Sequence, residues 1–282
     1  MSQLKNFGGL FRLDGKVAVI TGGSRGIGLH TATAFLQAGA ARVILVARKM
    51  DGPQGLSSAL EALHATIPDS RGRIVAIPCD LSQFSEVQRL AKEIGAIAPK
   101  IHILVANAGA TWGGPLDTTP DASITKVLDL NVRSIINLAR LLSPLLIKGG
   151  CPEDPARIII VGAIAGFTVP FTGENSTLVY SVSKAAAHHL ARNLAMEYGP
   201  RNVACNCVAP GFFPTKLSNG LIDIVGGVDA MAASNPLKRI GRPEDIAGTM
   251  VFLCSQAGSF VNGVVLPLDG GNFLQTGLFT KL

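Results

Sequence analysis

The sequence is poor in aromatic residues and has no long uninterrupted apolar run. Only 5% of its 282 residues are aromatic, although 48% are hydrophobic. The longest apolar stretches are broken by Gly, Asn or charged residues well short of the roughly 18 residues that a membrane-spanning helix needs. The N-terminus also lacks the apolar core of a signal peptide. We therefore expect a soluble protein with a well-buried core and no membrane partner.

Cysteine is scarce and its spacing fits neither a disulfide framework nor a metal site. The five cysteines are an odd number, and Cys205 and Cys207 are too close in a predicted strand to bridge each other. The full set is Cys79, Cys151, Cys205, Cys207 and Cys254. A reducing compartment follows, and we expect a cytoplasmic protein without a metal. The ending Thr280-Lys281-Leu282 differs by one residue from a peroxisomal address, which leaves that compartment as an alternative.

Basic residues do not form a run, although the formal net charge is +6. Residues 1–80 hold nine basic and five acidic side chains, so much of the excess lies in the first part of the chain. The absence of a Lys/Arg run or of a basic stripe with interleaved aromatics argues against nucleic acid as a partner. An anionic cofactor bound by this part of the chain explains the excess with fewer assumptions.

Short apolar runs alternate with longer helical patterns along the whole chain. The runs are nearly continuous in apolar residues, which is typical of parallel strands buried on both faces. Strands are predicted at 16–21, 43–47, 73–78, 101–106, 157–161 and 202–208. Helices are predicted at 26–38, 54–66, 84–96, 121–147, 179–199 and 243–255. The pattern predicts an α/β fold, a Rossmann-like doubly wound parallel sheet in one domain over residues 1–282.

Two irregular segments leave the carboxyl ends of predicted strands. They cover residues 167–178 and 211–240 and are rich in Gly, Pro and Asn. Ligands of open α/β sheets bind beyond the carboxyl ends of the strands. We therefore expect these two segments to form the walls of a substrate site.

A glycine-rich turn follows the first predicted strand and opens a helix. It reads TGGSRGIG at 21–28, and glycines there let the backbone approach a pyrophosphate at the positive end of the helix dipole. The second strand ends in Ala47-Arg48-Lys49, without the acid that an NAD site offers to the ribose hydroxyl. Arg48, with Lys49 and Arg25, can instead pair with a 2′-phosphate. The sequence therefore predicts NADP(H) as the cofactor.

The stretch YSVSK at 180–184 places a tyrosine and a lysine four residues apart in a predicted helix. Both side chains then project from one face. A nearby ammonium lowers a tyrosine pKa, so we expect Tyr180 to exchange a proton with a substrate at neutral pH.

Together with these two stretches, five more motifs follow a fixed order. They are Asp80-Leu81, Ala106-Asn107-Ala108-Gly109, Asn131 in LNVRS, Pro210-Gly211 and Asp269-Gly270-Gly271. Over about residues 12–272 the chain resembles the short-chain dehydrogenase/reductase family. It is most similar to the β-ketoacyl-carrier-protein reductase branch and to the ketoreductase type of rhamnolipid synthesis.

The resemblance implies an enzyme that moves hydride between a nicotinamide and a carbonyl/alcohol pair, and an assembly of two or four copies. It implies that Tyr180 protonates the carbonyl oxygen, that Lys184 holds the ribose and lowers the tyrosine pKa, and that Asn131 kinks its helix and fixes a water. Together with the glycine turn and the basic end of the second strand, the resemblance completes the predicted set of cofactor-binding residues, which are Gly22, Ser24, Arg25, Ile27, Gly28, Arg48, Lys49, Asp80, Leu81, Asn107, Gly109, Tyr180, Lys184, Pro210, Gly211, Phe213 and Thr215.

One position departs from the family pattern. Where the family has a serine after the fifth strand, the stretch VGAIAG at 161–166 offers Ala163. Four explanations stay open: an engineered change, a substitute hydroxyl, slow catalysis by Tyr180 alone, or the loss of reductase activity. The candidates for a substitute hydroxyl are Ser176, Thr177 and Ser181.

The remaining substrate residues are apolar. Phe167, Phe171, Phe212 and Phe213, with Ala163, predict an apolar pocket. Arg192 and Arg201 near the end of the helix that carries Tyr180 can either meet an acidic carrier protein or complement the helix dipole.

We therefore predict an NADPH-dependent ketoreductase that acts on a β-keto or polyketide-like carbonyl, free or carrier-bound. The alternative is a non-redox scaffold on the same fold that binds the cofactor, such as a cyclase or an NADPH sensor.

Overall fold

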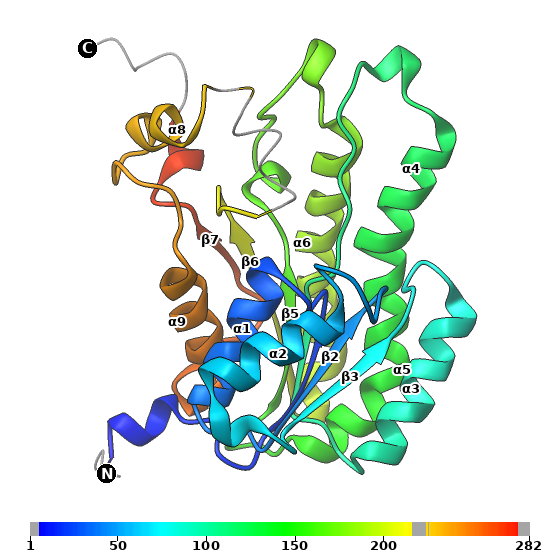
Figure 1. Cartoon of the computed structure of the whole chain (residues 1–282), viewed down its shortest axis with the longest axis vertical. Coiled ribbons are helices and arrows are strands. Elements are labelled where there is room, and N and C mark those ends of the chain that lie inside the picture. The colour runs from blue at the N-terminus through cyan, green and yellow to red at the C-terminus, as the bar shows by residue number, and fades with distance from the viewer. Residues whose placement is uncertain (1–5, 216–223, 225, 276–282) are drawn as a thin grey trace.

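Seven parallel strands form one sheet in the order β3-β2-β1-β4-β5-β6-β7 (Figure 1). This computed structural model describes residues 6–215, 224 and 226–275. The strands are β1 (Val17–Thr21), β2 (Arg42–Ala47), β3 (Ile74–Pro78), β4 (Ile103–Ala106), β5 (Ala156–Val161), β6 (Val203–Pro210) and β7 (Val265–Leu268). The six predicted strands are confirmed, and β7 is an additional edge strand that the sequence analysis did not predict.

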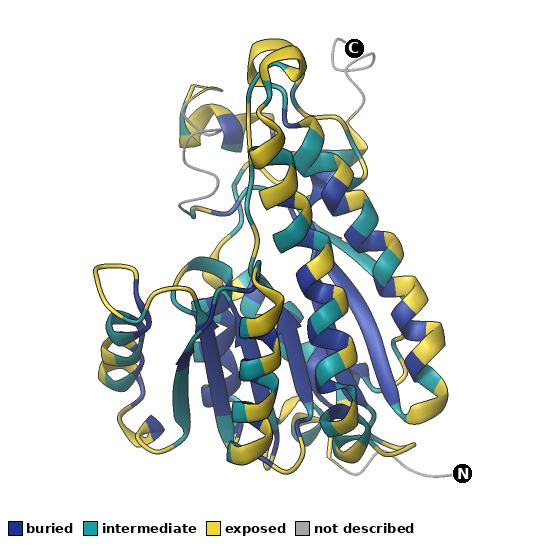
Figure 2. Cartoon of the chain, turned by 90° about the vertical axis from the view of Figure 1, so that its right-hand side faces the viewer, coloured by how far each residue is buried: buried dark blue, intermediate teal, exposed yellow. Residues whose placement is uncertain are grey.

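Helices cover both faces of the sheet, which confirms the Rossmann-like doubly wound fold (Figures 1 and 2). One face carries α1 (Gly26–Gln37), α2 (Leu56–Thr66) and α9 (Pro243–Cys254). The other face carries α3 (Phe84–Ile97), α5 (Ser134–Gly149) and α6 (Leu178–Tyr198). Figure 2 shows buried strands between helices whose outer sides are exposed. The nearly continuous apolar strands follow from this two-sided burial.

The order of the strands reverses between β1 and β4. From β1 the chain moves through β2 to β3 on one side, and β4 then pairs with the other edge of β1, with Ala18 opposite Ile103. Such a reversal leaves a crevice at the carboxyl ends of the two strands, because the connections that follow them diverge. Each predicted site motif that follows a strand lies at this end of the sheet.

The predicted helix 121–147 is interrupted. It consists of α4 (Asp121–Leu128), a single π-helical turn at Asp129–Arg133 and α5. By length and composition alone the stretch Asp121–Gly149 could cross a membrane. Here the apolar residues of α5, among them Leu138, Leu142 and Leu146, belong to the hydrophobic core against the sheet. The π turn contains Asn131, where the resemblance implied a kink.

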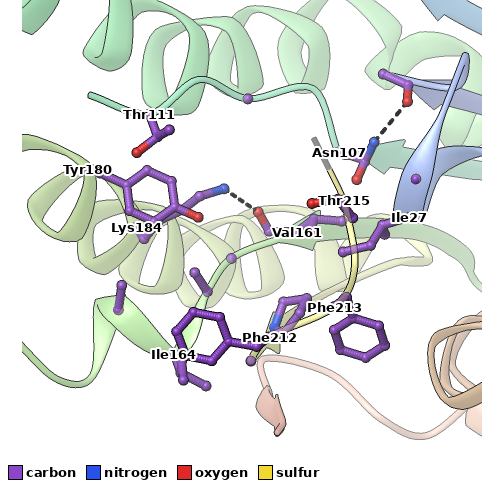
Figure 3. A pocket seen from close by; sticks show the side chains of 18 of the residues that line it. Ile27, Asn107, Thr111, Val161, Ile164, Tyr180, Lys184, Phe212, Phe213 and Thr215 are labelled. Atoms are coloured by element: carbon purple, nitrogen blue, oxygen red, sulfur yellow. Dashed lines mark hydrogen bonds between the residues drawn. The ribbon is translucent and has the colours of Figure 1, made fainter. Parts of the chain in front are cut away.

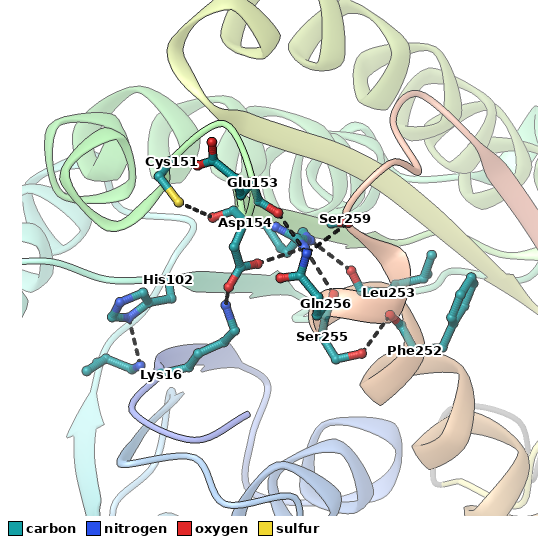
Figure 4. A network of polar contacts seen from close by, with 12 residues as sticks. Lys16, His102, Cys151, Glu153, Asp154, Phe252, Leu253, Ser255, Gln256 and Ser259 are labelled. Carbon is teal, nitrogen blue, oxygen red and sulfur yellow. Dashed lines mark hydrogen bonds and ion pairs between the residues drawn. The ribbon is translucent and has the colours of Figure 1, made fainter. Parts of the chain in front are cut away.

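The amino ends of the strands carry a network of polar contacts (Figure 4). Asp154 pairs with Lys16 and with Arg157, whose side chain is fully buried. The Arg157 guanidinium also donates to the carbonyl oxygens of Leu253 and Ser255, at 3.1 and 3.0 Å. The network therefore joins the starts of β1 and β5 to the end of α9.

Candidate active site

The glycine turn between β1 and α1 exposes backbone at a helix N-terminus. Gly22 and Gly26 have φ values of +63° and +52°, a region that side chains disfavour. A Cβ at Gly28 would lie 2.3 Å from the Gly22 carbonyl oxygen, so only glycine fits there. The Asn107 amide holds the turn by donating to the carbonyl oxygens of Thr21 and Gly22, at 2.9 and 3.1 Å. This cradle fits a pyrophosphate.

Two cavities meet beyond this turn. A groove of about 790 Å³ runs over the ends of β2 and β3, and a smaller pocket of about 220 Å³ lies over β5 and β6. The groove falls within the size range of small-molecule sites. Both cavities are lined by Gly22, Arg25, Ala108, Gly109 and Thr111. They therefore form one continuous site at the carboxyl ends of the strands.

Almost all predicted cofactor residues line this site. The groove is lined by Ser24, Arg48, Lys49, Asp80 and Leu81. The pocket is lined by Ile27, Asn107, Tyr180, Lys184, Pro210, Gly211, Phe213 and Thr215. Gly28 lies beneath the turn and lines neither cavity, because its role is to let the helix approach Gly22 closely.

The outer wall of the groove is basic. The groove is lined by the cations Arg25, Arg48, Lys49 and Lys126 and by two acids, Asp51 and Asp80. Asp51 accepts a hydrogen bond from the Ser57 hydroxyl. Arg25 donates a hydrogen bond to the Gln54 side chain. The sequence analysis did not single out Gln54, although its place in the loop after β2 could have indicated it. The excess of positive charge here fits an anionic group.

Tyr180 and Lys184 project into the pocket from the first two turns of α6 (Figure 3). The Lys184 Nζ lies 5.6 Å from the centre of the Tyr180 ring and donates to the Val161 carbonyl oxygen at 2.7 Å. Lys184 is 5% exposed, and burial lowers its pKa to about 8. The four-residue spacing thus delivers both groups to one cavity.

The predicted lowering of the Tyr180 pKa by Lys184 is not found in this structure. Burial raises the pKa of the Tyr180 phenol instead. The desolvation of the phenolate outweighs the ammonium, which is directed to the Val161 carbonyl oxygen rather than to the phenol. Tyr180 is therefore a protonated acid in this pocket.

Asn131 lies behind the site rather than in it. Its amide donates to the Ala110 carbonyl oxygen and the Ser183 hydroxyl, at 2.8 and 2.9 Å, and its oxygen accepts from the Ala110 N–H at 2.8 Å. The π turn thus ties the loop after β4 to α6, and it holds Gly109 within reach of Lys184, whose Nζ would be 3.7 Å from a Cβ at Gly109.

The substrate end of the pocket is apolar. Ala163 stands at the end of β5 and presents a methyl group, and Phe171 and Phe212 line the same pocket. Figure 3 shows the Phe212 ring beside Ile164. Phe213 fills the space against Gly241, where a Cβ would lie 2.5 Å from its ring. The predicted walls thus supply lining residues at 170, 171 and 177 and at 211–213 and 215, while 216–223 and 225 lie outside the described residues.

Two aromatic or basic candidates have other surroundings. Phe167 does not line the pocket but packs on His188, with ring centres 4.5 Å apart. Arg201 pairs with Glu197 at 3.1 Å, which engages it at the end of its own helix.

Comparison with known proteins identifies the fold and its family. A family model described as enoyl-(acyl carrier protein) reductase matches residues 22–272. A rhamnolipids biosynthesis 3-oxoacyl-[acyl-carrier-protein] reductase of Pseudomonas aeruginosa is 38% identical over 93% of this chain and 97% of its own length. The 7alpha-hydroxysteroid dehydrogenase of Escherichia coli is 34% identical over 92% of this chain and 95% of its own length.

A solved structure agrees with these relatives. The Pseudomonas aeruginosa RhlG/NADP active-site complex superposes with a TM-score of 0.83 at 38% identity, and the match covers 94% of this chain and 99% of that one. The sheet order, the glycine turn and the Tyr180–Lys184 pair are thus found together with similarity over nearly the whole chain. The chain belongs to the short-chain dehydrogenase/reductase family.

Proposed function

We propose that this protein is an NADPH-dependent ketoreductase that reduces a β-keto or polyketide-like carbonyl, with Tyr180 as the general acid. The observation that carries the proposal is the junction of the two cavities. Tyr180 and Lys184 line the pocket where it meets the groove, opposite an apolar wall. A carbonyl bound there would lie between a proton donor and the end of a dinucleotide site.

The groove supports NADP(H) as the cofactor. Its glycine turn fits a pyrophosphate, and Arg25, Arg48 and Lys49 supply three cations for a 2′-phosphate. The solved RhlG structure is described as an NADP complex. When bound, the reduced nicotinamide supplies hydride to the carbonyl carbon.

The chain's own residues supply the proton. The Tyr180 phenol donates to the carbonyl oxygen as negative charge develops there. Lys184 would hold the nicotinamide ribose, and its ammonium favours the phenolate that forms. Asn131 positions this pair by joining the loop after β4 to Ser183 on α6.

The apolar lining favours an acyl or polyketide-like substrate. Phe171, Phe212 and Ala163 offer no charge to a substrate, so affinity must come from apolar contact. The relatives are named for 3-oxoacyl-[acyl-carrier-protein] reduction and for 7alpha-hydroxysteroid dehydrogenation. The substrate is a small molecule that is either free or carried on a protein.

The scaffold alternative is not favoured. The relatives are a reductase and a dehydrogenase, and a protein that only senses NADPH has no use for a desolvated lysine beside a tyrosine. Loss of NADPH absorbance during turnover separates the two functions, because a sensor binds NADPH without oxidising it.

We also propose a homodimer or homotetramer in the cytoplasm. Met196 and Phe260 are 79% and 102% exposed, which favours burial against another copy. All five cysteines are free thiols, as a reducing compartment would keep them.

The test follows NADPH absorbance with a panel of diffusible β-keto esters, a 3-oxoacyl thioester of N-acetylcysteamine and cyclic ketones. We expect turnover by the native chain and a loss of roughly 10³-fold in kcat for Tyr180→Phe, because the general acid is removed. NADPH binding, measured by its fluorescence, should persist in the variant. Full activity of Tyr180→Phe, or binding of NADPH without oxidation by any carbonyl, would contradict the proposal.

A further inference from the structure

Among the described residues, the pocket wall that follows β5 offers no side-chain hydrogen-bond donor to a substrate. A carbonyl oxygen that gains negative charge is best stabilised by more than one donor, and removal of one such donor typically slows an enzyme by about 10²- to 10³-fold. Ala163 presents only a methyl group at this wall. Among the described lining residues, the hydroxyls other than that of Tyr180 belong to Thr111, Thr177 and Thr215.

Thr177 is placed unlike an ordinary helix-capping threonine. It is the N-cap residue of α6, a position where a threonine side chain normally accepts a hydrogen bond from the first turn. Here its side chain makes no such bond. Its hydroxyl is buried without a hydrogen-bond partner in the described part of the chain, and the residue is only 2% exposed. The usual structural reason for this residue is therefore absent.

An unpartnered hydroxyl is costly at this position. Burying a hydroxyl without a partner costs on the order of 1–3 kcal/mol, which a valine of similar shape would avoid. Thr177 also lies three residues before Tyr180, so the two side chains share a face at the start of the helix, and both line the pocket. Thr177 thus carries an unpartnered hydroxyl on a residue that lines the same pocket as the general acid.

The other hydroxyls are less suited. Ser176 accepts a hydrogen bond from the Leu178 N–H at 3.4 Å and does not line the pocket. Ser181 has a buried unpartnered hydroxyl but does not line the pocket either, because adjacent helical residues do not face the same way. Thr215 packs against Gly26 in the cofactor turn.

Thr111 is the strongest rival. Figure 3 shows it on the same side of the pocket as Tyr180, and it lines both cavities. Its side chain is only half-buried, so water can satisfy its hydroxyl. The Thr177 Oγ1 has almost no accessible surface in this structure, so the side chain must rotate about its Cα–Cβ bond to present the hydroxyl to the pocket, where a substrate oxygen would be its partner.

We infer that the Thr177 hydroxyl is the second hydrogen-bond donor to the substrate carbonyl oxygen, in the role that Ala163 cannot fill. The inference rests on the proposed ketoreductase function. In the reaction the carbonyl carbon gains a hydride from the reduced nicotinamide, and the oxygen gains the Tyr180 proton, which gives the alcohol. Thr177 contributes a hydrogen bond and neither gains nor loses a proton.

The experiment compares Thr177→Val, Thr177→Ser, Thr111→Val and Ser181→Ala with the native chain. Each is also made with Ala163→Ser, and all are assayed with the 3-oxoacyl thioester and NADPH. Thr177→Val should lower kcat about 10²-fold with an unchanged KM for NADPH, because the donor is lost while the cofactor groove is intact. Thr177→Ser should keep most of the activity, since it keeps the hydroxyl.

The matched control is Ser181→Ala, which removes a buried unpartnered hydroxyl from the same helix turn but outside the pocket. It should stay within about threefold of the native kcat. Addition of Ala163→Ser should raise kcat at least tenfold more in the Thr177→Val chain than in the native chain, because one serine then restores the missing donor.

Three results would overturn the inference while the proposed function stands. These are an active Thr177→Val chain, a larger loss in Thr111→Val than in Thr177→Val, and an equal gain from Ala163→Ser with or without Thr177. If no chain oxidises NADPH with any carbonyl, even with serine at 163, the proposed function itself fails and the inference fails with it.

Discussion

The two ends of the sheet differ in whether a buried cation has a counter-charge. At the amino ends, Arg157 is fully buried and donates to Asp154 and to two carbonyl oxygens, although its Nη1 has no hydrogen-bond partner among the described residues (Figure 4). At the carboxyl ends, Lys184 is buried with one carbonyl oxygen as its hydrogen-bond acceptor, and the Thr177 hydroxyl has no partner in the described chain. The amino end joins distant elements, whereas the carboxyl end keeps groups ready for a ligand.

The difference indicates that polar groups at the amino ends of the strands stabilise the fold, whereas those at the carboxyl ends lower its stability. Removal of one partner of a buried charge pair is strongly destabilising, because it leaves the other charge buried without compensation. An unpaired one is destabilising from the start, and sites of chemistry commonly carry that cost. Substitutions at the two ends should therefore change stability with opposite signs.

The largest change in stability is expected from Asp154→Asn at the amino end. The substitution leaves Lys16 and Arg157 without a counter-charge, and it should lower the free energy of unfolding by about 2–3 kcal/mol. Urea unfolding measures the loss, and kcat should stay near that of the native chain. Asp69→Asn is the matched control, since Asp69 is 81% exposed in its pair with Arg73 and its loss should cost no more than about 0.5 kcal/mol. A similar loss of stability in Asp154→Asn and Asp69→Asn would show that the buried pairs of Asp154 contribute no more than an exposed ion pair.

An increase in the free energy of unfolding is expected from Lys184→Met at the carboxyl end. The pKa of Lys184 is lowered from 10.5 to about 8 by burial, so the native chain binds this proton less tightly than the unfolded chain does. The group destabilises the fold fully below about pH 8, and the effect fades as the pH rises towards 10.5. Lys184→Met should therefore raise the free energy of unfolding by about 2 kcal/mol at pH 7 while turnover is lost.

The surface control for this variant is Lys148→Met on α5, where the lysine is exposed. It should change the free energy of unfolding by less than about 0.5 kcal/mol. A Lys184→Met chain that is less stable than the native chain at pH 7 would show that the hydrogen bond to Val161 outweighs the desolvation of the ammonium.

A smaller change in stability is expected at acid pH, and one histidine at each end of the sheet contributes to it. Burial lowers the pKa of His188, behind the pocket, and of His102, at the amino ends, from 6.5 to about 4. The unfolded chain binds protons between pH 6.5 and 4 that the native chain does not, so stability falls as the pH falls through that range. Each histidine should account for about 1–2 kcal/mol of the loss between pH 7 and 4.5.

Urea unfolding of His188→Gln and His102→Asn at pH 7 and pH 4.5 measures the contribution of each histidine to the loss of stability in acid. Asn at 102 can still accept the hydrogen bond that the Val17 N–H donates to the imidazole at 3.0 Å. An acid-induced loss as large as that of the native chain in both variants would assign the pH dependence to other groups.

The sequence predicted the scaffold well, and most of the residues that it singled out line the two cavities, because both results depend on local signals. Apolar runs gave six strands, and the glycine turn and YSVSK carry their chemistry within a few residues. The strand β7 escaped prediction because it has four residues, one of them Pro267, and is only partly buried. The π turn gave no sign beyond Asn131, since its residues suit an ordinary helix.

The electrostatics of the site could not be predicted in the same way. The direction of the Tyr180 pKa depends on how deeply the ring is buried, and the unpartnered state of the Thr177 hydroxyl depends on which groups tertiary packing brings near it. The bond from Arg25 to Gln54 joins two loops that are 29 positions apart. None of these follows from spacing along the chain.

The π turn at Asp129–Arg133 divides the long helix into two segments, α4 and α5, whose side-chain faces are rotated relative to each other. An α-helix advances about 100° per residue, so one extra residue in a turn rotates everything beyond it by about that angle. The half before the turn can then face α6, while the half after it faces α3 and the sheet. Deletion of one residue within this turn would remove the rotation between α4 and α5. Either α4 would then lose its contact with α6, or α5 would lose its contacts with α3 and the sheet. The length of this helix is therefore constrained by its neighbours on two sides, and a change of one residue within the turn should disrupt the packing of one of its two segments.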